Sequence, residues 1–179
     1  NVLIGGNAGD ALTAGDFNIA IGKNALGAED DHGKNVAVGH EALKDQDAGA
    51  DAFNVAVGYK AGENITTGIE NVIMGGRAGD ALTTGGYNVA IGHAALTTED
   101  TYGLNVAVGA YALYTLNAGA DAYNTAVGYK AGENISTGTQ NTIIGGLAGD
   151  ALTTGSYNVA LGKGALSTED DHGRNVAIG

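Results

Sequence analysis

The sequence contains no cysteine, proline or tryptophan, and its 179 residues include only 2 Phe and 8 Tyr. Without cysteine there is no thiol nucleophile, and the redox compartment of the protein stays open. Because proline is absent and glycine follows no three-residue period, a collagen triple helix is excluded. The apolar residues, 44% of the chain, are mostly Ala and Val. We therefore expect a thin core with few large side chains.

Basic residues are also scarce, with 8 Lys and Arg against 20 Asp and Glu and a net charge of −12. Nucleic-acid binding needs a basic footprint, so a nucleic-acid partner is not expected, and neither is an anionic membrane surface. No apolar run is long enough to span a bilayer. The chain starts with "NVLIGG" and stops with "NVAIG", both inside a motif, which suggests a fragment of a longer array.

Glycine, by contrast, is abundant, at 32 of 179 residues against roughly 7% in average proteins. An asparagine followed four residues later by glycine, with Val, Ile, Leu or Met just before that glycine, occurs eleven times, at intervals of 17 or 19 residues. Four intervals add up to 70 residues, and "AVGYKAGENI" is repeated unchanged at 56–65 and 126–135. This nested period predicts a single repeat array over residues 1–179, with coils of about 17 residues in four-coil blocks of 70.

We number each coil from its asparagine, which is position 1, so that the glycine is position 5. Stacked position-1 amides are expected to form a hydrogen-bonded ladder. Gly at position 5 is expected to supply a corner conformation that other residues resist. The candidate ladder residues are Asn18, Asn35, Asn54, Asn71, Asn88, Asn105, Asn124, Asn141 and Asn158. The candidate turn residues are Gly22, Gly39, Gly58, Gly75, Gly92, Gly109, Gly128, Gly145 and Gly162.

Positions 1 to 5 are β-branched, alternating and closed by glycine, which predicts a short strand, and no helical period is present. We expect a second strand in each coil, with Leu or Ile at position 9 or 12 filling a narrow interior. Stacked coils would pair as parallel strands about 4.8 Å apart, so that ten coils form an all-β, parallel β-solenoid about 48 Å long.

Two packing expectations follow for the strand. We expect Val and Ile at positions 2 and 4 to fill the coil interior, and the small residues at positions 1, 3, 5 and 8 to lie against a neighbouring chain; the reverse assignment remains open. Position 6 is glycine only where position 3 is Leu or Ile, so we also expect positions 3 and 6 to share space. A roll this thin buries little surface, which favours self-association, with three copies around the long axis.

The segments "NVAVGYKAG", "ITTG" and "NVIMGG" resemble the repeats of trimeric fibres over essentially the whole chain. One branch of this family comprises the YadA-like heads of trimeric autotransporter adhesins, which are left-handed parallel β-rolls. The other comprises the shaft repeats of phage tail fibres. The sequence of residues 123–129, an aromatic residue followed by Asn-Thr-Ala-Val-Gly-Tyr, is closer to the phage arrays. The resemblance implies a left-handed β-roll, a homotrimer, and an extracellular location on a virion tail fibre or a cell surface.

Three patterns could carry chemistry. "GYKAGEN" is glycine-rich, but it lacks the P-loop spacing and Lys60 is replaced in most coils, which disfavours phosphate binding. "EDDHG" at 29–33 and 169–173 could supply calcium ligands, yet the middle block has "EDTYG" at 99–103, which favours a solvated acidic loop. His40 and His93 are expected to be exposed side chains.

No serine, histidine and carboxylate set suggests catalysis; the only serines are Ser136, Ser156 and Ser167. The surface tyrosines are interpreted mainly as edge packing and less as sugar-stacking sites; they are Tyr59, Tyr111, Tyr114 and Tyr129. We therefore expect no enzyme activity, cofactor or metal site.

The leading hypothesis is a structural segment of an elongated trimeric fibre, a phage tail fibre shaft that supports host recognition. The alternatives are a bacterial adhesin head that binds host glycan or matrix, and a self-assembling extracellular filament. A cell-surface glycan or receptor is the partner expected besides a second copy of the chain.

Overall fold

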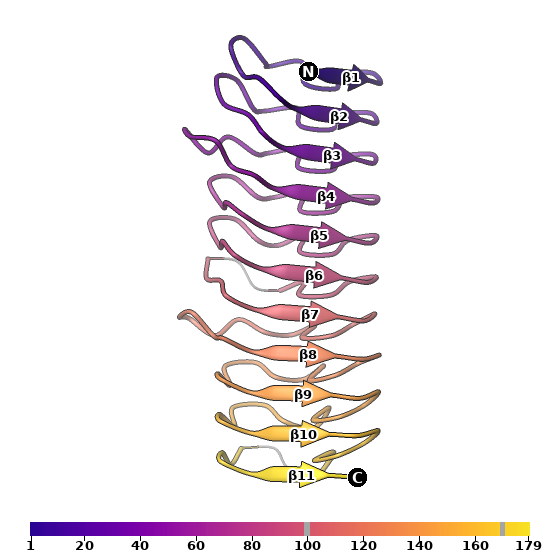
Figure 1. The fold of residues 1–179 in the computed structure, drawn as a ribbon, viewed down its shortest axis with the longest axis vertical. Coiled ribbons are helices and arrows are strands. Elements are labelled where there is room, and N and C mark those ends of the chain that lie inside the picture. Colours follow the sequence, from indigo (N-terminus) through magenta and orange to yellow (C-terminus); the bar gives the residue numbers. More distant parts are fainter. Residues whose placement is uncertain (99–100, 169–170) are drawn as a thin grey trace.

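A computed structural model describes residues 1–98, 101–168 and 171–179, which form one stack of coils (Figure 1). Each coil contributes one three-residue strand, and all eleven strands pair in parallel in a single sheet, in the order of the sequence. The described part of the chain contains no helix. The strands are β1 (Val2–Ile4), β2 (Ile19–Ile21), β3 (Val36–Val38), β4 (Val55–Val57), β5 (Val72–Met74), β6 (Val89–Ile91), β7 (Val106–Val108), β8 (Thr125–Val127), β9 (Thr142–Ile144), β10 (Val159–Leu161) and β11 (Val176–Ile178).

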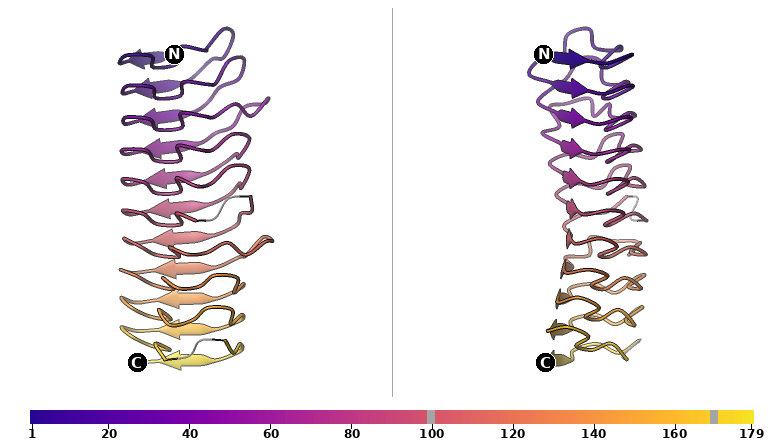
Figure 2. Two further views of the ribbon diagram at one scale, coloured as in Figure 1. Left: turned by 180° about the vertical axis from the view of Figure 1, so that it is seen from behind. Right: turned by 90° about the vertical axis from the view of Figure 1, so that its right-hand side faces the viewer.

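The register places the same position of each coil directly above that position of the next. In β4 and β5, for example, Val55 pairs with Val72 and Val57 with Met74. The 19-residue coils keep this register and place their extra residues in the loops, which project farther from the stack (Figures 1 and 2). The predicted parallel β-solenoid is confirmed. Ten steps of about 4.8 Å place β1 and β11 about 48 Å apart.

The second strand expected in each coil is wrong. The chain opposite the sheet consists of turns, because the residues at positions 7 and 9 adopt a positive φ that breaks an extended strand. In one coil these residues are Asn24, with φ of 56°, and Leu26, with φ of 51°. Bonds between coils nevertheless continue there, since the Leu26 N–H donates to the Ala42 carbonyl at 3.0 Å.

The preferred assignment of the strand faces is also wrong, and the reverse one holds. Ala56, at position 3 of β4, is fully buried, whereas Val55 and Val57 on either side of it remain partly exposed. Ala61, at position 8, is fully buried as well. The interior therefore contains Asn and Ala from the sheet side and Ala and Leu from the turn side. Position 3 is small in most strands, because the large side chains that fill the interior come mainly from the turn side.

Positions 3 and 6 do not compensate each other's volume. Gly76 faces outward, where a methyl group would meet only His93 and the Tyr59 carbonyl, at 3.5 and 4.0 Å. Ile73 instead fills space above Gly79 at position 9, where a methyl group would lie 3.1 Å from the Ile73 Cδ1 atom. A large residue at position 3 is thus matched by glycine at position 9, inside the coil.

Position 12 supplies a second interior side chain. Ile65 and Leu82 are fully buried there, as expected for apolar plugs. Two polar residues occupy the same position in other coils, and both Glu29 and Gln46 are fully buried. The core of the solenoid therefore contains one ionisable carboxyl group among the described residues at this position.

Candidate functional site

The ladder asparagines bridge successive coils with both ends of the side-chain amide. The Oδ1 atom of Asn71 accepts the backbone N–H of Asn88 at 2.9 Å, in the next coil. Its Nδ2 donates to the Gly85 carbonyl at 3.0 Å, in its own coil, and to Oδ1 of Asn54 at 3.2 Å. The Asn N–H to Asn Oδ1 bond recurs between all eleven coils, at 2.8–3.1 Å. All nine candidate ladder residues are buried, so the hydrogen bonds of this column connect each coil to its neighbours within the interior.

One longer coil adds a third bond to this ladder. The Nδ2 atom of Asn54 donates to the Gly68 carbonyl and to Oε1 of Gln46, both at 2.7 Å. Gln46 in turn donates through Nε2 to the Thr66 carbonyl at 2.9 Å. The buried glutamine thus satisfies its amide within the ladder, which explains how a polar residue occupies an interior position.

The position-5 glycines form a second column, at the corner where the strand ends. The candidate glycines have φ between 120° and 143°, a region that side chains other than hydrogen rarely adopt. A methyl group on Gly75 would lie 2.6 Å from the carbonyl oxygen of Gly92 in the next coil. Glycine is therefore required at this corner both by backbone conformation and by the close approach of neighbouring coils.

The outer face of the sheet is apolar along the whole stack. Positions 2 and 4 of every strand carry Val, Ile, Leu, Met or Thr, and they point away from the interior. Met74, Ile144 and Leu161 are about two-fifths exposed, at 40%, 38% and 43%. A long strip of mainly apolar side chains that are at least partly exposed usually marks an interaction surface. We call it the outer sheet face.

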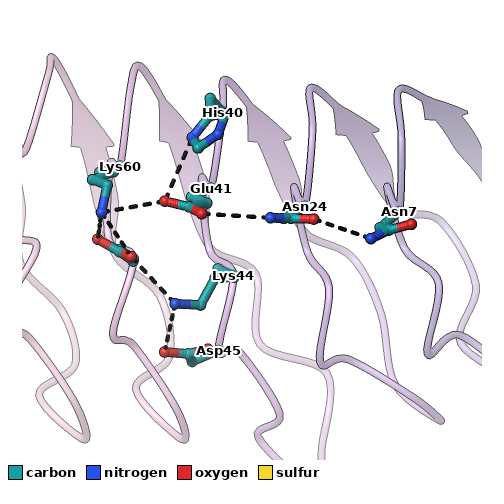
Figure 3. Close-up of polar contacts among 8 residues, drawn as sticks. Asn7, Asn24, His40, Glu41, Lys44, Asp45 and Lys60 are labelled. Atoms are coloured by element: carbon teal, nitrogen blue, oxygen red, sulfur yellow. Dashed lines mark hydrogen bonds and ion pairs between the residues drawn. The ribbon is translucent and has the colours of Figure 1, made fainter.

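A polar network crosses the turn side of the first coils (Figure 3). Asn24 connects Asn7 to Glu41, through bonds of 3.3 and 3.4 Å. The Lys60 ammonium group then lies 3.2 Å from the Glu41 carboxylate and 3.0 Å from that of Glu63. Ion pairs that remain partly accessible to water contribute little stability, so the network is best described as a charged surface.

Lys60 is the lysine of the glycine-rich "GYKAGEN" segment. Its hydrogen bond with Glu63, and then that with Glu41, raises the pKa of its ammonium group. Both partners are carboxylates, so the group that would meet a phosphate is already paired with negative charge. The glycines of the segment, Gly58 and Gly62, have positive φ values and form corners of the coil.

The acidic loop at 29–33 is only partly solvated. Asp30 and Asp31 are exposed, as expected, but Glu29 is fully buried at position 12. Its carboxylate accepts the His32 N–H at 3.1 Å and Nδ2 of Asn35 at 3.4 Å. Burial raises the pKa of Glu29, with a further contribution from the negative charge of Asp47. The matching glutamates of the other two blocks, at 99 and 169, lie outside the described residues.

Glu29, Asp30 and His32 could each offer one ligand atom, and these atoms lie within 4.8 Å of one another. The Glu29 carboxylate, however, already has protein donors on both oxygens. Exposed Asp30 also accepts a bond, from the Asp31 N–H at 2.6 Å. Hydrogen bonds within the loop thus occupy Glu29 and Asp30, whereas the buried Nδ1 atom of His32 has no hydrogen-bond partner among the described residues.

We expect Glu29→Gln to stabilise the protein at neutral pH, because glutamine fits the same position in the next coil as Gln46. The folded-state pKa of Glu29 is raised, so its carboxyl group favours folding below its ordinary pKa near 4.5. That contribution is lost as the pH rises through the folded-state value. The variant should melt a few degrees higher than the wild type at pH 7. Its stability should also no longer fall with the ionisation of this carboxyl group. Thermal melts at pH 4 and pH 7 measure both effects, and an unchanged pH profile would contradict the burial of this carboxyl group.

The tyrosines singled out in the sequence pack with their neighbours on the turn side. Tyr111 makes edge contacts with Tyr114 and Tyr129, at centroid distances of 5.6 and 6.5 Å. Tyr59 stacks on His40 at 5.5 Å. His40 is half-buried rather than exposed, whereas His93 is exposed as expected. The tyrosine rings therefore form local clusters within a column, and only Tyr59 and Tyr129 expose about half of their surface.

Sequence reasoning missed a second set of aromatic residues, immediately before the ladder asparagines. In every second coil this residue is Phe or Tyr, and each of the five is at least half exposed. They are Phe17, Phe53, Tyr87, Tyr123 and Tyr157. The alternation was readable in the sequence, but the position falls in a segment interpreted as a loop. We call this set the aromatic column.

The Thr13 and Thr153 hydroxyls donate to the carboxylates of Asp31 and Asp171, at 2.6 and 2.7 Å. The Ser136 and Ser156 hydroxyls donate to the carbonyl oxygens of Thr153 and Thr154, at 3.2 and 3.5 Å. In the same part of the chain, no helix is long and apolar enough to cross a membrane. The features that stand out are therefore surfaces: the outer sheet face and the aromatic column.

No protein-family model, curated protein or solved structure matches the sequence. The assignment to trimeric fibre repeats thus rests on the resemblance of the repeats alone.

Proposed function

We propose that the chain is a structural segment of an elongated homotrimeric fibre, the shaft of an extracellular phage tail fibre that supports host recognition. The observation that carries this proposal is the outer sheet face, which runs unbroken from β1 to β11. A solenoid with one long, mainly apolar side favours a partner of the same length. A second copy of the same chain meets that requirement position by position.

The shape of the coil favours a threefold arrangement. Three such sheets can pack around a common axis with their apolar faces inward and their polar turn sides in water. The turn side carries the charged network around Lys60 and Glu63, which suits a solvent-facing position. In such a fibre the buried Asn and Gly columns would resist bending within each chain, and the outer sheet faces would hold the chains together.

The double variant Val55→Asp, Val57→Asp tests the proposal, because it places two carboxylates on β4 within the outer sheet face. Burying these charges against other chains is costly, so we expect the assembly to dissociate. The fold within each chain should survive, since both side chains already face outward. Light scattering on a sizing column gives the mass, and far-UV circular dichroism reports the fold.

A matched control is Tyr59→Asp, Tyr129→Asp, which adds the same two charges at exposed positions on the turn side. This control should keep the mass of the wild-type assembly. If the Val55 and Val57 variant also keeps that mass, the outer sheet face is not the subunit contact. If this variant loses its fold and the control does not, Val55 and Val57 point into the coil interior and not outward.

The aromatic column favours a second candidate, a surface adhesin head that contacts host glycan or matrix. Exposed aromatic residues contribute strongly to binding surfaces, whereas a purely mechanical shaft does not need them. The sequence that flanks the array separates the two candidates. A chaperone domain after the array supports the phage shaft, and a coiled-coil stalk with a membrane anchor supports the adhesin.

A further inference from the structure

The aromatic column repeats with a step of two coils. The exposed fractions of Phe17, Phe53, Tyr87, Tyr123 and Tyr157 are 76%, 52%, 52%, 55% and 50%. Adjacent coils of a parallel sheet are about 4.8 Å apart, so successive rings recur about every 9.6 Å along the stack. Exposed aromatic side chains at a constant spacing on a rigid support form a linear surface for an extended ligand.

The backbone does not require aromatic residues at these positions. All five have φ between 52° and 63°, a left-handed conformation that glycine and asparagine adopt at lower cost. The same conformation is occupied by Glu70 and Gln140 in the alternate coils. Burial does not explain the rings either, since at least half of each is in water. The backbone conformation is therefore common to all coils, and the exposed aromatic side chain is what distinguishes these five positions.

Hydrogen bonds between coils hold the column in place. The Tyr87 N–H donates to the Ile69 carbonyl, and the Tyr157 N–H to the Thr139 carbonyl, both at 3.0 Å. The residue of the intervening coil lies directly beside its aromatic neighbour. The Lys34 ammonium lies 5.0 Å from the centre of the Phe53 ring, and the Arg174 guanidinium 5.4 Å from that of Tyr157.

The column alternates rings with groups that can form hydrogen bonds. Between the aromatic residues lie Lys34, Glu70, Leu104 and Gln140, and Arg174 follows the last ring. An open hollow of about 380 Å³ is lined by Phe53 and Glu70. A ligand that follows the column would meet a flat apolar ring, then in most steps a polar side chain, and then a ring again.

We propose that the aromatic column binds an extended, uncharged β-1,4-linked polysaccharide, with one ring stacked on every second sugar. In such a polymer each sugar is turned over relative to the last, so the same C–H-rich face recurs once per disaccharide. That repeat is close to the two-coil step of the column. Stacking of an aromatic ring on the C–H face, with hydrogen bonds to the sugar hydroxyls between rings, uses both kinds of side chain present.

Charge complementarity selects an uncharged polymer. The chain carries a net charge of −12, which repels anionic polysaccharides. Within the column itself, the negative charge of Glu70 partly offsets the positive charges of Lys34 and Arg174. Lys34 is also paired with Asp51. The column is present in a single chain, so this binding does not depend on the fibre assembly proposed above.

The test compares binding of cellohexaose and fully N-acetylated chitohexaose with binding of maltohexaose, an α-linked hexasaccharide, by isothermal titration on the full chain. The double variant Tyr87→Asn, Tyr123→Asn removes two rings and introduces a residue that tolerates the left-handed backbone. We expect the wild type to bind one or both β-1,4-linked sugars in preference to maltohexaose. The double variant should weaken this binding by about tenfold or more, without loss of the fold.

The matched control is Tyr59→Asn, Tyr129→Asn, which removes two equally exposed tyrosines outside the column and should leave binding unchanged. The proposal is overturned if neither β-1,4-linked sugar binds, if maltohexaose binds equally well, or if both double variants lose binding alike. It is also overturned if Tyr87→Asn, Tyr123→Asn changes the mass of the assembly, since the column would then be a contact between copies. A monomeric wild type that binds these sugars would contradict the fibre proposal alone.

Discussion

Replacement of Gly75 by alanine is expected to unfold the central coils of the solenoid. The added methyl group would lie 2.6 Å from the Gly92 carbonyl oxygen, and φ at this position is 131°. This contact cannot relax through a side chain, because the methyl group would meet backbone atoms of Gly92 in the stacked corner. The combined strain should cost about 3 kcal/mol or more. Thermal denaturation followed by far-UV circular dichroism measures this loss.

The neighbouring residue provides a matched control. Gly76 faces outward with no positive φ, and a methyl group there would meet its nearest atom, in His93, at 3.5 Å. Gly76→Ala should therefore change stability by no more than about 0.5 kcal/mol, as surface substitutions usually do. Equal effects of the two substitutions would contradict the stacked corners. Because coils interact mainly with adjacent coils, hydrogen exchange should locate the damage around β5 and β6.

Asn71→Ala is the second substitution with a large expected effect. It leaves the Asn88 N–H and the Gly85 carbonyl without their partners in the interior, where water cannot replace them. Each unsatisfied buried group costs about 1–3 kcal/mol, so the total loss should be about 2–5 kcal/mol. Thermal and urea denaturation of the full chain give the change in the free energy of unfolding.

Asn71→Asp separates the two roles of the ladder amide. An aspartate retains an oxygen that accepts the Asn88 N–H, but it loses the donor that reaches Gly85 and Asn54. At neutral pH it also buries a negative charge beside two acceptor oxygens, so we expect it to destabilise at least as strongly as alanine. Protonation in acid restores a donor, so its deficit relative to the wild type should shrink. The exposed Asn117 provides the control: Asn117→Ala should be nearly neutral.

The coil and its stacking could be predicted from the sequence because Asn and Gly recur at a fixed offset in every coil. Their roles follow from their chemistry: a buried amide such as Asn71 needs two partners, and a corner such as Gly75 needs a conformation that excludes a side chain. The second strand could not be predicted in this way. The positive φ of Leu26 arises from the tight turn around the core, and leucine does not normally indicate such a conformation.

The orientation of the strand faces was not determined by hydrophobicity, because both faces are apolar. Ala56 is inside and Val57 outside because the interior is too narrow for larger residues on every strand. Glu29 illustrates a different limit of prediction from the sequence. Counting from the ladder asparagine places it in line with Ile65 and Gln46, which was readable in advance, but its acidic neighbours indicated a solvated loop.

The mass of the wild-type chain in solution tests most directly whether the outer sheet face joins copies of this protein. Sedimentation equilibrium gives that mass independently of shape, and sedimentation velocity on the same sample reports elongation. We expect the mass of three 17.7 kDa chains and slow sedimentation typical of a rod. A compact particle with the mass of one chain, or a stable assembly of any other number of chains, would contradict the account.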